Sequence, residues 1–398
     1  MERIETDILV AGGGLAGLAA AVRLAASGRD ITVVDPAPAE AGLGDDRRTT
    51  ALLRPAIETL ERAGAWAGMA ATAAPLWTMR LIDAGGVERR PRETADFTAV
   101  EMQDQPFGWN VTNSAAKAAL LDRAGELPNV RFERGVAVTG LLTRSTEALV
   151  RLSDGRQLRA RLAVAADGRD STLREAAGIS TRRWRYGQTA LVFPVTHPEP
   201  HGGVSTEIHR TGGPLTLVPM PDLEGRPSSS VVWMVPEERG ERLMELDDAA
   251  LGAELTAETM GLFGPLTLAG ARQGWPMICQ LAMRMAGERL ALVAESAHVI
   301  PPIGAQGLNM SLADVECLAR LIEQRPHGDP GVADLLARYE MRRWPETAAR
   351  VAGIDTLNRF AQAEAQPVRD IRRLGLKAIH DIAPIRHLAM RLGMGAVG

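Results

Sequence analysis

A glycine-rich turn between two apolar stretches decides the fold: residues 6–17 read TDILVAGGGLAG, and ITVVD follows at residues 31–35. The apolar run before the turn predicts a buried strand, and the Ala/Leu-rich run after it predicts a helix. Gly12 permits the tight turn, Gly14 lets backbone amides approach a pyrophosphate, and Gly17 lets the helix pack closely on the strand. These residues predict a phosphate-binding turn.

The order strand, glycine turn, helix, strand and acid is that of a dinucleotide-binding unit. Asp35 ends the second strand and is placed to accept a hydrogen bond from a ribose hydroxyl. The first N–H groups of the helix have no partner within it and favour an anion. Glycine-rich turns also occur for purely steric reasons, but the flanking elements together indicate dinucleotide binding. This unit alone does not distinguish FAD from NAD.

Two distant segments add motifs of the same kind. Residues 163–174 read AVAADGRDSTLR, an apolar strand that ends in an Asp-Gly pair before a helix opens. Residues 290–298 read LALVAESAH, and the Pro/Gly loop PPIGAQGLN at residues 301–309 leads into a helix that we expect to begin near Leu308. The chain therefore carries three nucleotide-type motifs in order.

These motifs resemble those of the p-hydroxybenzoate-hydroxylase-like flavoprotein monooxygenases, and more closely those of the ubiquinone-biosynthesis hydroxylase branch. The resemblance implies an FAD-dependent monooxygenase that hydroxylates an aromatic ring with O2 and NADPH or NADH. It also implies a lipophilic small-molecule substrate, a polyprenyl phenol intermediate of ubiquinone biosynthesis. Further segments that carry the resemblance are DRRTTAL at residues 46–52, FGWNVTN at 107–113, GPLTLVP at 213–219, VVW at 231–233, YEMRR at 339–343 and LNRF at 357–360.

The resemblance also implies which residues lie at the flavin. The Asp-Gly motif lies near FAD and serves pyridine-nucleotide use, and the later motif binds the ribityl chain. That later motif usually reads Gly-Asp, whereas this chain has Ala294-Glu295, so we expect a shifted ribityl contact rather than loss of FAD. The residues assigned to cofactor binding are Gly12, Gly14, Leu15, Ala16, Gly17, Asp35, Arg48, Asp167, Gly168, Arg174, Glu295, Pro302, Gly304, Gly307, Leu308 and Asn309.

In this interpretation the flavin carries the chemistry, and the protein orients and protects it. The backbone amides of Gly307, Leu308 and Asn309 open a helix and are expected to stabilise negative charge on the reduced flavin. Arg48 is a second candidate near the flavin, with an ordinary surface arginine as the alternative. His298 is a weaker catalytic candidate, because a histidine packed against the same loop explains the sequence equally well. The sequence offers no metal-binding cluster.

The predicted fold class is α/β: a Rossmann-like FAD-binding domain with an inserted antiparallel-sheet substrate domain and a helical C-terminus. Alternating apolar residues and Gly/Pro turn clusters in the middle of the chain predict the inserted sheet, which is able to roof a pocket. The FAD-binding domain is expected to comprise residues 1–75, 101–180 and 275–345, the substrate-binding sheet residues 76–100 and 181–274, and the C-terminal helical segment residues 346–398.

Bulk properties limit the partners and the location. The net charge of −4 gives no reason to expect nucleic-acid binding. Only two cysteines, Cys279 and Cys317, occur, which favours a reduced cytoplasmic protein. The apolar run at residues 8–26 contains Arg23 and several glycines, so it predicts neither a signal peptide nor a membrane span.

The stretch 368–392 combines apolar residues at roughly helical spacing with basic residues that outnumber the acidic ones. Such a helix can lie in the headgroup layer on the inner face of the cytoplasmic membrane, or it can pack on the FAD domain or on the second subunit of a homodimer. Two rival functions stay open. One is a same-fold hydroxylase or reductase for a small soluble substrate, and the other is a non-catalytic flavoprotein scaffold in a quinone-biosynthesis complex.

Overall fold

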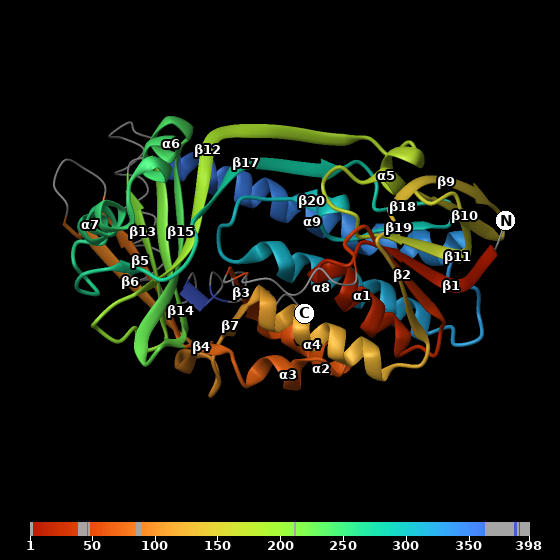
Figure 1. The fold of residues 1–398 in the computed structure, drawn as a ribbon, viewed down its shortest axis with the longest axis horizontal. Helices are drawn as coiled ribbons and strands as arrows, with labels where there is room; N and C mark the ends of the chain where they lie inside the picture. The colour runs from red at the N-terminus through yellow and green to blue at the C-terminus, as the bar shows by residue number, and fades with distance from the viewer. Residues whose placement is uncertain are drawn as a thin grey trace.

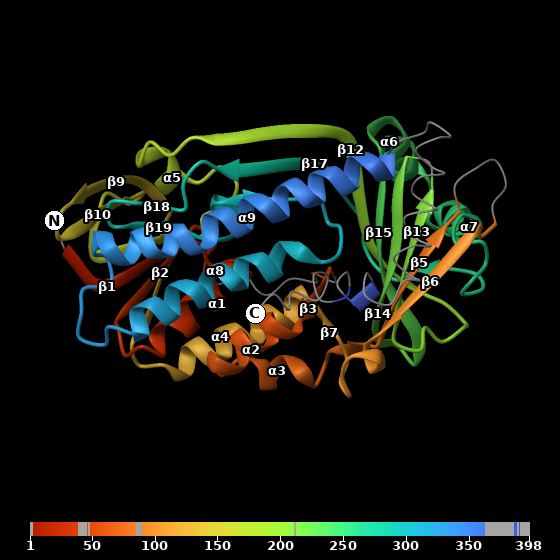
Figure 2. The ribbon, with the colours of Figure 1, turned by 180° about the vertical axis from the view of Figure 1, so that it is seen from behind.

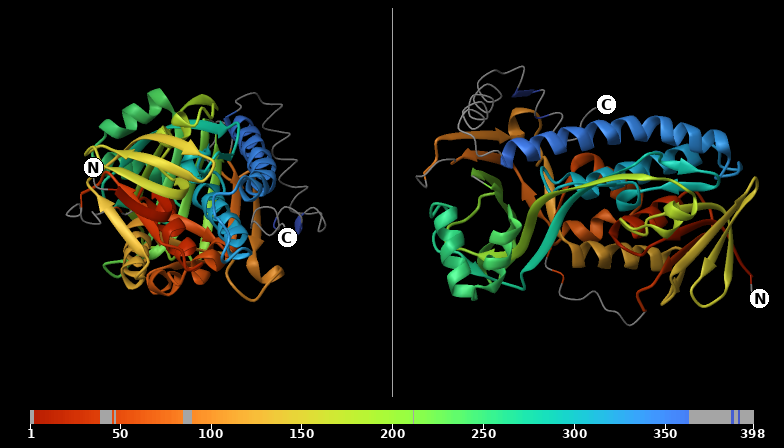
Figure 3. Two further views of the ribbon diagram at one scale, coloured as in Figure 1. Left: turned by 90° about the vertical axis from the view of Figure 1, so that its right-hand side faces the viewer. Right: turned by 90° about the horizontal axis from the view of Figure 1, so that it is seen from above.

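The molecule is elongated, with one large sheet at each end (Figure 1). Helices α8 (Gln306–Glu323) and α9 (Ala333–Gln362) run between the two ends and face the viewer in Figure 2. The long strands β12 (Thr181–Thr196) and β17 (Gln273–Ala282) also pass from one end to the other (Figure 3). The computed structural model describes residues 3–38, 46, 48–84, 90–210, 212–362, 386, 387 and 390.

The first sheet has the predicted glycine-turn unit at its centre. Its parallel strands pair in the order β19, β11, β1, β2 and β8, so that Val10 lies opposite both Val164 and Val33. All three valines are fully buried, as strands covered on both faces require. The strands are β1 (Arg3–Ala11), β2 (Ile31–Asp35), β8 (Val130–Arg134), β9 (Val138–Arg144), β10 (Glu147–Leu152), β11 (Gln157–Ala165), β18 (Ala286–Gly287) and β19 (Leu290–Leu292).

Helices cover this sheet and link it to the rest of the molecule. Leu18 of α1 shares a hydrophobic cluster with Ile57 of α2, Leu120 of α4 and Leu312 of α8. The other side of α8 packs with α9 into the core of the sheet. The remaining helices are α1 (Leu15–Ala25), α2 (Arg54–Arg62), α3 (Trp66–Ala70), α4 (Asn113–Glu126), α5 (Thr172–Ala176), α6 (Glu237–Glu245), α7 (Asp248–Glu258), η1 (Ala99–Glu101) and η2 (Ala294–Ser296).

The second sheet pairs in the order β20, β17, β12, β15, β14, β13, β5 and β6. It is antiparallel as predicted, except that β5 and β13 pair in parallel. One face packs Phe193 and Trp233 against Leu243 of α6 and Leu251 of α7, which leaves the other face toward the first sheet (Figure 1). Its other strands are β5 (Thr78–Asp83), β6 (Glu93–Thr98), β13 (Val204–Arg210), β14 (Gly213–Leu223), β15 (Arg226–Pro236), β16 (Thr267–Leu268) and β20 (His298–Val299), and a small third sheet holds β3 (Thr49–Leu53), β4 (Ala74–Leu76) and β7 (Gly108–Thr112).

The α/β fold class predicted from the sequence is confirmed, and the helical C-terminus begins earlier than expected because α9 starts at Ala333. Strands β17 and β20 hydrogen-bond within the second sheet, although the sequence boundary placed them with the FAD-binding domain. The long β12–β17 ladder runs across that boundary. The domain limits in residue numbers therefore stay a prediction.

Most of the basic stretch 368–392 lies outside the described residues. Of the part that is described, Arg386 forms an ion pair with Glu101 and donates to the carbonyl oxygen of Asp96 at 2.7 Å. Met390 is buried against Phe97 of β6. These residues contact the second sheet. Among the described residues, no helix has the length and hydropathy of a membrane span.

Candidate active site

In the glycine turn between β1 and α1, backbone atoms pack closely against two of the glycines, Gly12 and Gly17. A Cβ at Gly12, whose φ is +105°, would lie 2.3 Å from the carbonyl oxygen of Ala166, and one at Gly17 would lie 1.9 Å from that of Gly12. A Cβ at Gly14 would meet nothing within 4 Å. Gly12 and Gly17 are therefore needed by the fold, whereas Gly14 borders open space.

Asp35 braces this turn. Its Oδ2 accepts from the N–H of Gly13, and its Oδ1 accepts from the N–H of Ala37 at 2.8 Å. Each carboxylate oxygen can accept more than one hydrogen bond. A ribose hydroxyl would thus share the carboxylate with the turn it supports.

A cavity of about 500 Å³ lies at the turn. Helices α1 and α8 both begin at this cavity, and neither has a side chain capping its first N–H groups. Helix α4 also begins there, but Thr112 caps it by accepting from the N–H of Ala115 at 3.3 Å. The cavity is lined by Gly14, Leu15, Ala16, Gly17, Asp46, Arg48, Asn113, Ser114, Lys117, Ala166, Gly168, Ala294, Glu295, His298, Val299, Ile300, Gly307, Leu308 and Ser311.

Arg48 connects the cavity to the second sheet. Its Nε and Nη2 donate to Asp46 at 2.8 and 2.7 Å, and these bonds hold the pKa of Asp46 below its ordinary value. Its guanidinium carbon lies 5.3 Å from the ring centre of Trp275 on β17, within the range of a cation–π contact. Arg48 is therefore a fixed part of the cavity wall.

Residues 294–300 form another wall. Ala294 has a φ of +58°, a left-handed conformation that disfavours a residue with a Cβ. This is the position at which the resemblance leads one to expect glycine. The side chain of Glu295 is 53% exposed, and its Oε2 lies 3.7 Å from Nε of Arg169.

Asp167 and Arg174 lie beside the cavity and support it. Asp167 Oδ2 accepts from the N–H of Leu173 at 3.1 Å, while its Oδ1 is buried without a partner among the described residues. Burial raises the pKa of Asp167 above its ordinary value. Arg174 donates to the carbonyl oxygens of Arg169 and Ser296 at 2.9 and 3.0 Å, so its role in this structure is to hold two loops together.

The first turn of α8 is anchored by the side chain of Asn309. Asn309 accepts from the N–H of Leu53 at 2.8 Å and donates to the carbonyl oxygen of Ala51, also at 2.8 Å. Gly307 and Leu308 line the cavity, whereas Pro302 and Gly304 lie outside its lining in the exposed loop before the helix. The start of α8 thus presents backbone N–H groups to the cavity, while the side chain of Asn309 holds the helix against β3.

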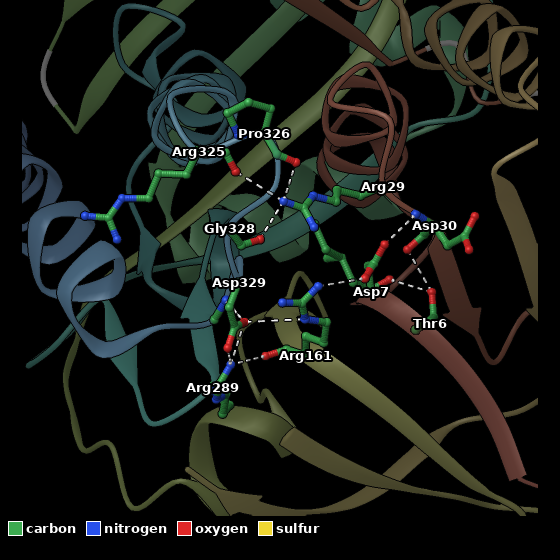
Figure 4. Close-up of polar contacts among 12 residues, drawn as sticks. Thr6, Asp7, Arg29, Asp30, Arg161, Arg289, Arg325, Pro326, Gly328 and Asp329 are labelled. Carbon is green, nitrogen blue, oxygen red and sulfur yellow. Dashed lines mark hydrogen bonds and ion pairs between the residues drawn. The ribbon is translucent and has the colours of Figure 1, made fainter. Parts of the chain in front are cut away.

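Another cavity, of about 680 Å³, is lined by Arg289, Gly331 and Met341 among others. The charge of Arg289 is already matched there, because its Nη1 donates to Asp329 at 2.7 Å and to the carbonyl oxygen of Arg161 at 3.2 Å (Figure 4). The three nucleotide-type motifs meet at the smaller cavity. We therefore place the functional site there.

The family model described as an FAD binding domain matches residues 5–353 of the chain. The chain belongs to this FAD-binding family. The resemblance inferred from the motifs is thereby confirmed, with FAD as the cofactor and an FAD-dependent monooxygenase as the enzyme class. NADPH or NADH is the co-substrate typical of such enzymes.

Relatives match nearly the whole chain. Ubiquinone hydroxylase UbiL of Rhodospirillum rubrum is 35% identical over 395 residues, which cover 98% of this chain and 90% of that protein. The 3-demethoxyubiquinol 3-hydroxylase of Escherichia coli is 28% identical and covers 98% of both chains. The structure of p-nitrophenol 4-monooxygenase PnpA from Pseudomonas putida superposes with a TM-score of 0.79 over 98% of this chain at 18% identity, which shows the shared fold.

The residues at the cavity suit FAD. Open space at Gly14 leaves room for a pyrophosphate against the start of α1, and the uncapped start of α8 offers a second set of N–H groups for an anion. The buried Oδ1 of Asp167, which has no partner among the described residues, lies on the residue between Ala166 and Gly168 of the cavity lining. When bound, FAD would supply the redox chemistry with oxygen, which side chains alone do poorly.

Sequence reasoning missed the contribution of α4. Asn113, Ser114 and Lys117 line the cavity, yet they were not singled out as site residues. A usable signal was present, because the capping residue Thr112 places a polar helix start directly after strand β7. Asp46 likewise belongs to one of the segments that carry the family resemblance, but its pairing with Arg48 in the structure was not among the predictions.

Proposed function

We propose that this FAD-dependent monooxygenase hydroxylates the ring of a polyprenyl phenol intermediate of ubiquinone biosynthesis, using O2 and NADPH or NADH. The names of the relatives support this substrate class, since two of them are ubiquinone-pathway hydroxylases that match nearly the whole chain. The substrate would be small, aromatic and lipophilic.

The observation that carries the proposal is an apolar cluster on the second sheet, contacted by the loop that continues from Ile300 of the cavity wall to α8. Ala190, Met234 and Met277 form a buried cluster on three neighbouring strands, and Ile303 from the loop before α8 packs against it. A ring held between this cluster and the cavity would be shielded from water. The N–H groups that open α8 at Gly307 would favour negative charge on the flavin beside it.

Polar residues at the same place are proposed to position the ring and the cofactor. Arg48, braced by Asp46 and facing Trp275, provides a fixed positive charge at the junction of the cavity and the second sheet. Asp167 is proposed to serve the reaction with the nicotinamide. His298 is proposed as a support of the cavity wall, since its Nε2 is bonded to Asp314.

The test is aerobic incubation of the flavin-loaded protein with NADPH and a panel of phenols that carry short isoprenoid tails, with product mass read directly. We expect NADPH oxidation that accelerates with a tailed phenol and a product that contains one added oxygen atom. Turnover of small soluble phenols only would favour the same-fold hydroxylase. A product without added oxygen would favour a reductase. No product and no NADPH oxidation coupled to any phenol would favour a scaffold.

We further propose contact with the inner face of the cytoplasmic membrane, because an isoprenoid tail places the substrate in the bilayer. The basic stretch 368–392 would attract anionic headgroups, with about 1 kcal/mol for each near-surface Lys or Arg. Flotation with anionic liposomes should retain the full chain and release a chain that ends at Gln366. Equal behaviour of both forms at low salt would instead favour packing of this stretch on the protein, within a quinone-biosynthesis complex or across a homodimer.

A further inference from the structure

Asp314 is a fully buried carboxylate behind the cavity wall. Its Oδ2 accepts from His298 Nε2 at 2.7 Å and from the N–H of Ala294 at 3.2 Å. Its Oδ1 accepts from Nε of Arg343 at 2.9 Å. One side chain of α8 thus joins the wall at residues 294–298 to helix α9.

The bond to Ala294 falls on a strained point of the wall. Residues other than glycine rarely adopt the left-handed conformation that Ala294 has, because the Cβ approaches the following carbonyl oxygen. A buried N–H in that conformation must find an acceptor, and Asp314 is that acceptor. The same carboxylate orients His298, which lines the cavity four residues later.

Helix α9 completes the arrangement. Arg343, with only 4% of its side chain exposed, pairs with both Asp314 and Glu346. Arg350 donates to Glu346 at 3.1 Å and to Gln306, the first residue of α8, at 3.1 Å. This series of hydrogen bonds and ion pairs therefore runs from the cavity wall at residues 294–298, through α9, to the start of α8, which forms another wall of the cavity.

We propose that Asp314 and Arg343 are positioning residues that hold residues 294–298 in the shape that receives FAD. They act through the backbone of Ala294 and the ring of His298 and have no part in the chemistry. Changing one partner of a buried ion pair leaves the other charge uncompensated and lowers stability whatever else the pair does. The proposal therefore predicts a change in FAD affinity that exceeds what lost stability alone explains.

The test combines Asp314→Asn with Ala294→Gly, because glycine adopts the left-handed conformation without support. FAD affinity is measured by flavin fluorescence, and the melting temperature of the flavin-free protein is measured in parallel. Asp314→Asn should weaken FAD binding on the order of ten-fold. In the double variant, Ala294→Gly should restore most of that loss, and the gain should exceed its effect in the otherwise unchanged protein.

Glu316→Gln is the matched control. Glu316 lies two residues along the same helix and forms a buried ion pair with Arg23 at 2.7 Å, away from the wall. It should lower the melting temperature without changing FAD affinity. The proposal would be overturned if Asp314→Asn and Glu316→Gln weakened FAD binding equally. It would also be overturned if Ala294→Gly changed FAD affinity equally in the parent protein and in the Asp314→Asn variant.

A second variant covers the case in which Asp314→Asn does not fold. Arg343→Lys keeps the charge, but a lysine cannot bridge Asp314 and Glu346 as the guanidinium does. It should weaken FAD binding several-fold and respond to Ala294→Gly in the same direction. Unchanged FAD affinity in Arg343→Lys would contradict the proposal. Neither measurement involves the aromatic substrate, so these results stand apart from the proposed function.

Discussion

Gly14 is a position where a substitution should affect cofactor binding without affecting the fold. A Cβ there meets nothing within 4 Å, and its φ of −72° suits any residue. Gly14→Val should therefore fold with a melting temperature close to that of the flavin-free parent, yet bind no FAD because its side chain fills the phosphate space. Flavin content after purification and thermal unfolding check this together.

Gly17→Val provides the contrast, since a Cβ there would overlap the carbonyl oxygen of Gly12. This variant should fail to accumulate as folded protein. A yellow, flavin-loaded Gly14→Val protein would show that the first turn has been misassigned.

Replacement of Ala294 by glycine should stabilise the protein. The left-handed conformation costs about 1–2 kcal/mol for a residue with a Cβ, and glycine returns about 0.4–1 kcal/mol of that through the freedom of the unfolded chain. Ala294→Gly should therefore raise the free energy of unfolding by about 1 kcal/mol in chemical denaturation. Ala297→Gly is the control, because Ala297 is buried in an ordinary right-handed conformation, and it should lower stability.

Asp167 should affect flavin reduction without supporting stability. Because burial raises its pKa, the ionised carboxylate destabilises the folded protein above that pKa. The penalty shrinks as the pH falls below the raised pKa and is gone at the ordinary pKa of an aspartate. Asp167→Asn should thus melt at or above the parent temperature at neutral pH, with the difference lost in acid. We expect slower anaerobic reduction by NADPH, measured by stopped flow.

Asp170→Asn is the matched control for that measurement. Asp170 is 70% exposed on the same loop and pairs with Arg183. It should leave the reduction rate unchanged. Normal reduction of Asp167→Asn would remove the assigned role of Asp167.

At the scale of elements, hydrogen bonds from the side chain of Asn309 hold the start of α8 against β3. Truncation of Asn309 to Ala leaves the N–H of Leu53 and the carbonyl oxygen of Ala51 without their partner. A fully buried group left in this way costs about 1–3 kcal/mol. Leu53 is buried and Ala51 is partly buried, so Asn309→Ala should lower the free energy of unfolding by about 2 kcal/mol and weaken FAD binding. Ser311→Ala, which removes one bond to the carbonyl oxygen of Gly307 within the same helix, should have a small effect on stability.

The elements near the motifs were predictable because each has a local cause. The turn at residues 12–17 and the strand that ends before Asp167 follow from glycine sterics and apolar periodicity. The side-chain role of Asn309 was not predictable, because its partners at residues 51 and 53 lie far away in the sequence. The same holds for Asp314, since nothing local indicates that a helical acid will meet Ala294 and Arg343.

At the scale of the whole molecule, the presence of two sheets could be predicted from the sequence, but the way the chain passes between them could not. Alternating apolar residues predicted the second sheet, but the pattern did not indicate that β17 belongs to it, or that β20 rejoins it after β18 and β19 have paired in the first sheet. Strand register depends on tertiary packing as well as on pattern. Strand β17 brings Trp275 against Arg48 of the cavity wall.

As an FAD-dependent monooxygenase, the chain should transfer one oxygen atom from O2 to an aromatic ring. The most direct measurement is a single incubation of the flavin-loaded protein with NADPH, a short-chain prenyl phenol and isotopically labelled dioxygen, followed by mass spectrometry. The account predicts a product that carries one labelled oxygen atom, in an amount that rises with NADPH consumed, and no product from Gly14→Val. A product with oxygen derived from water, or NADPH consumption that releases only peroxide with every phenol, would contradict it.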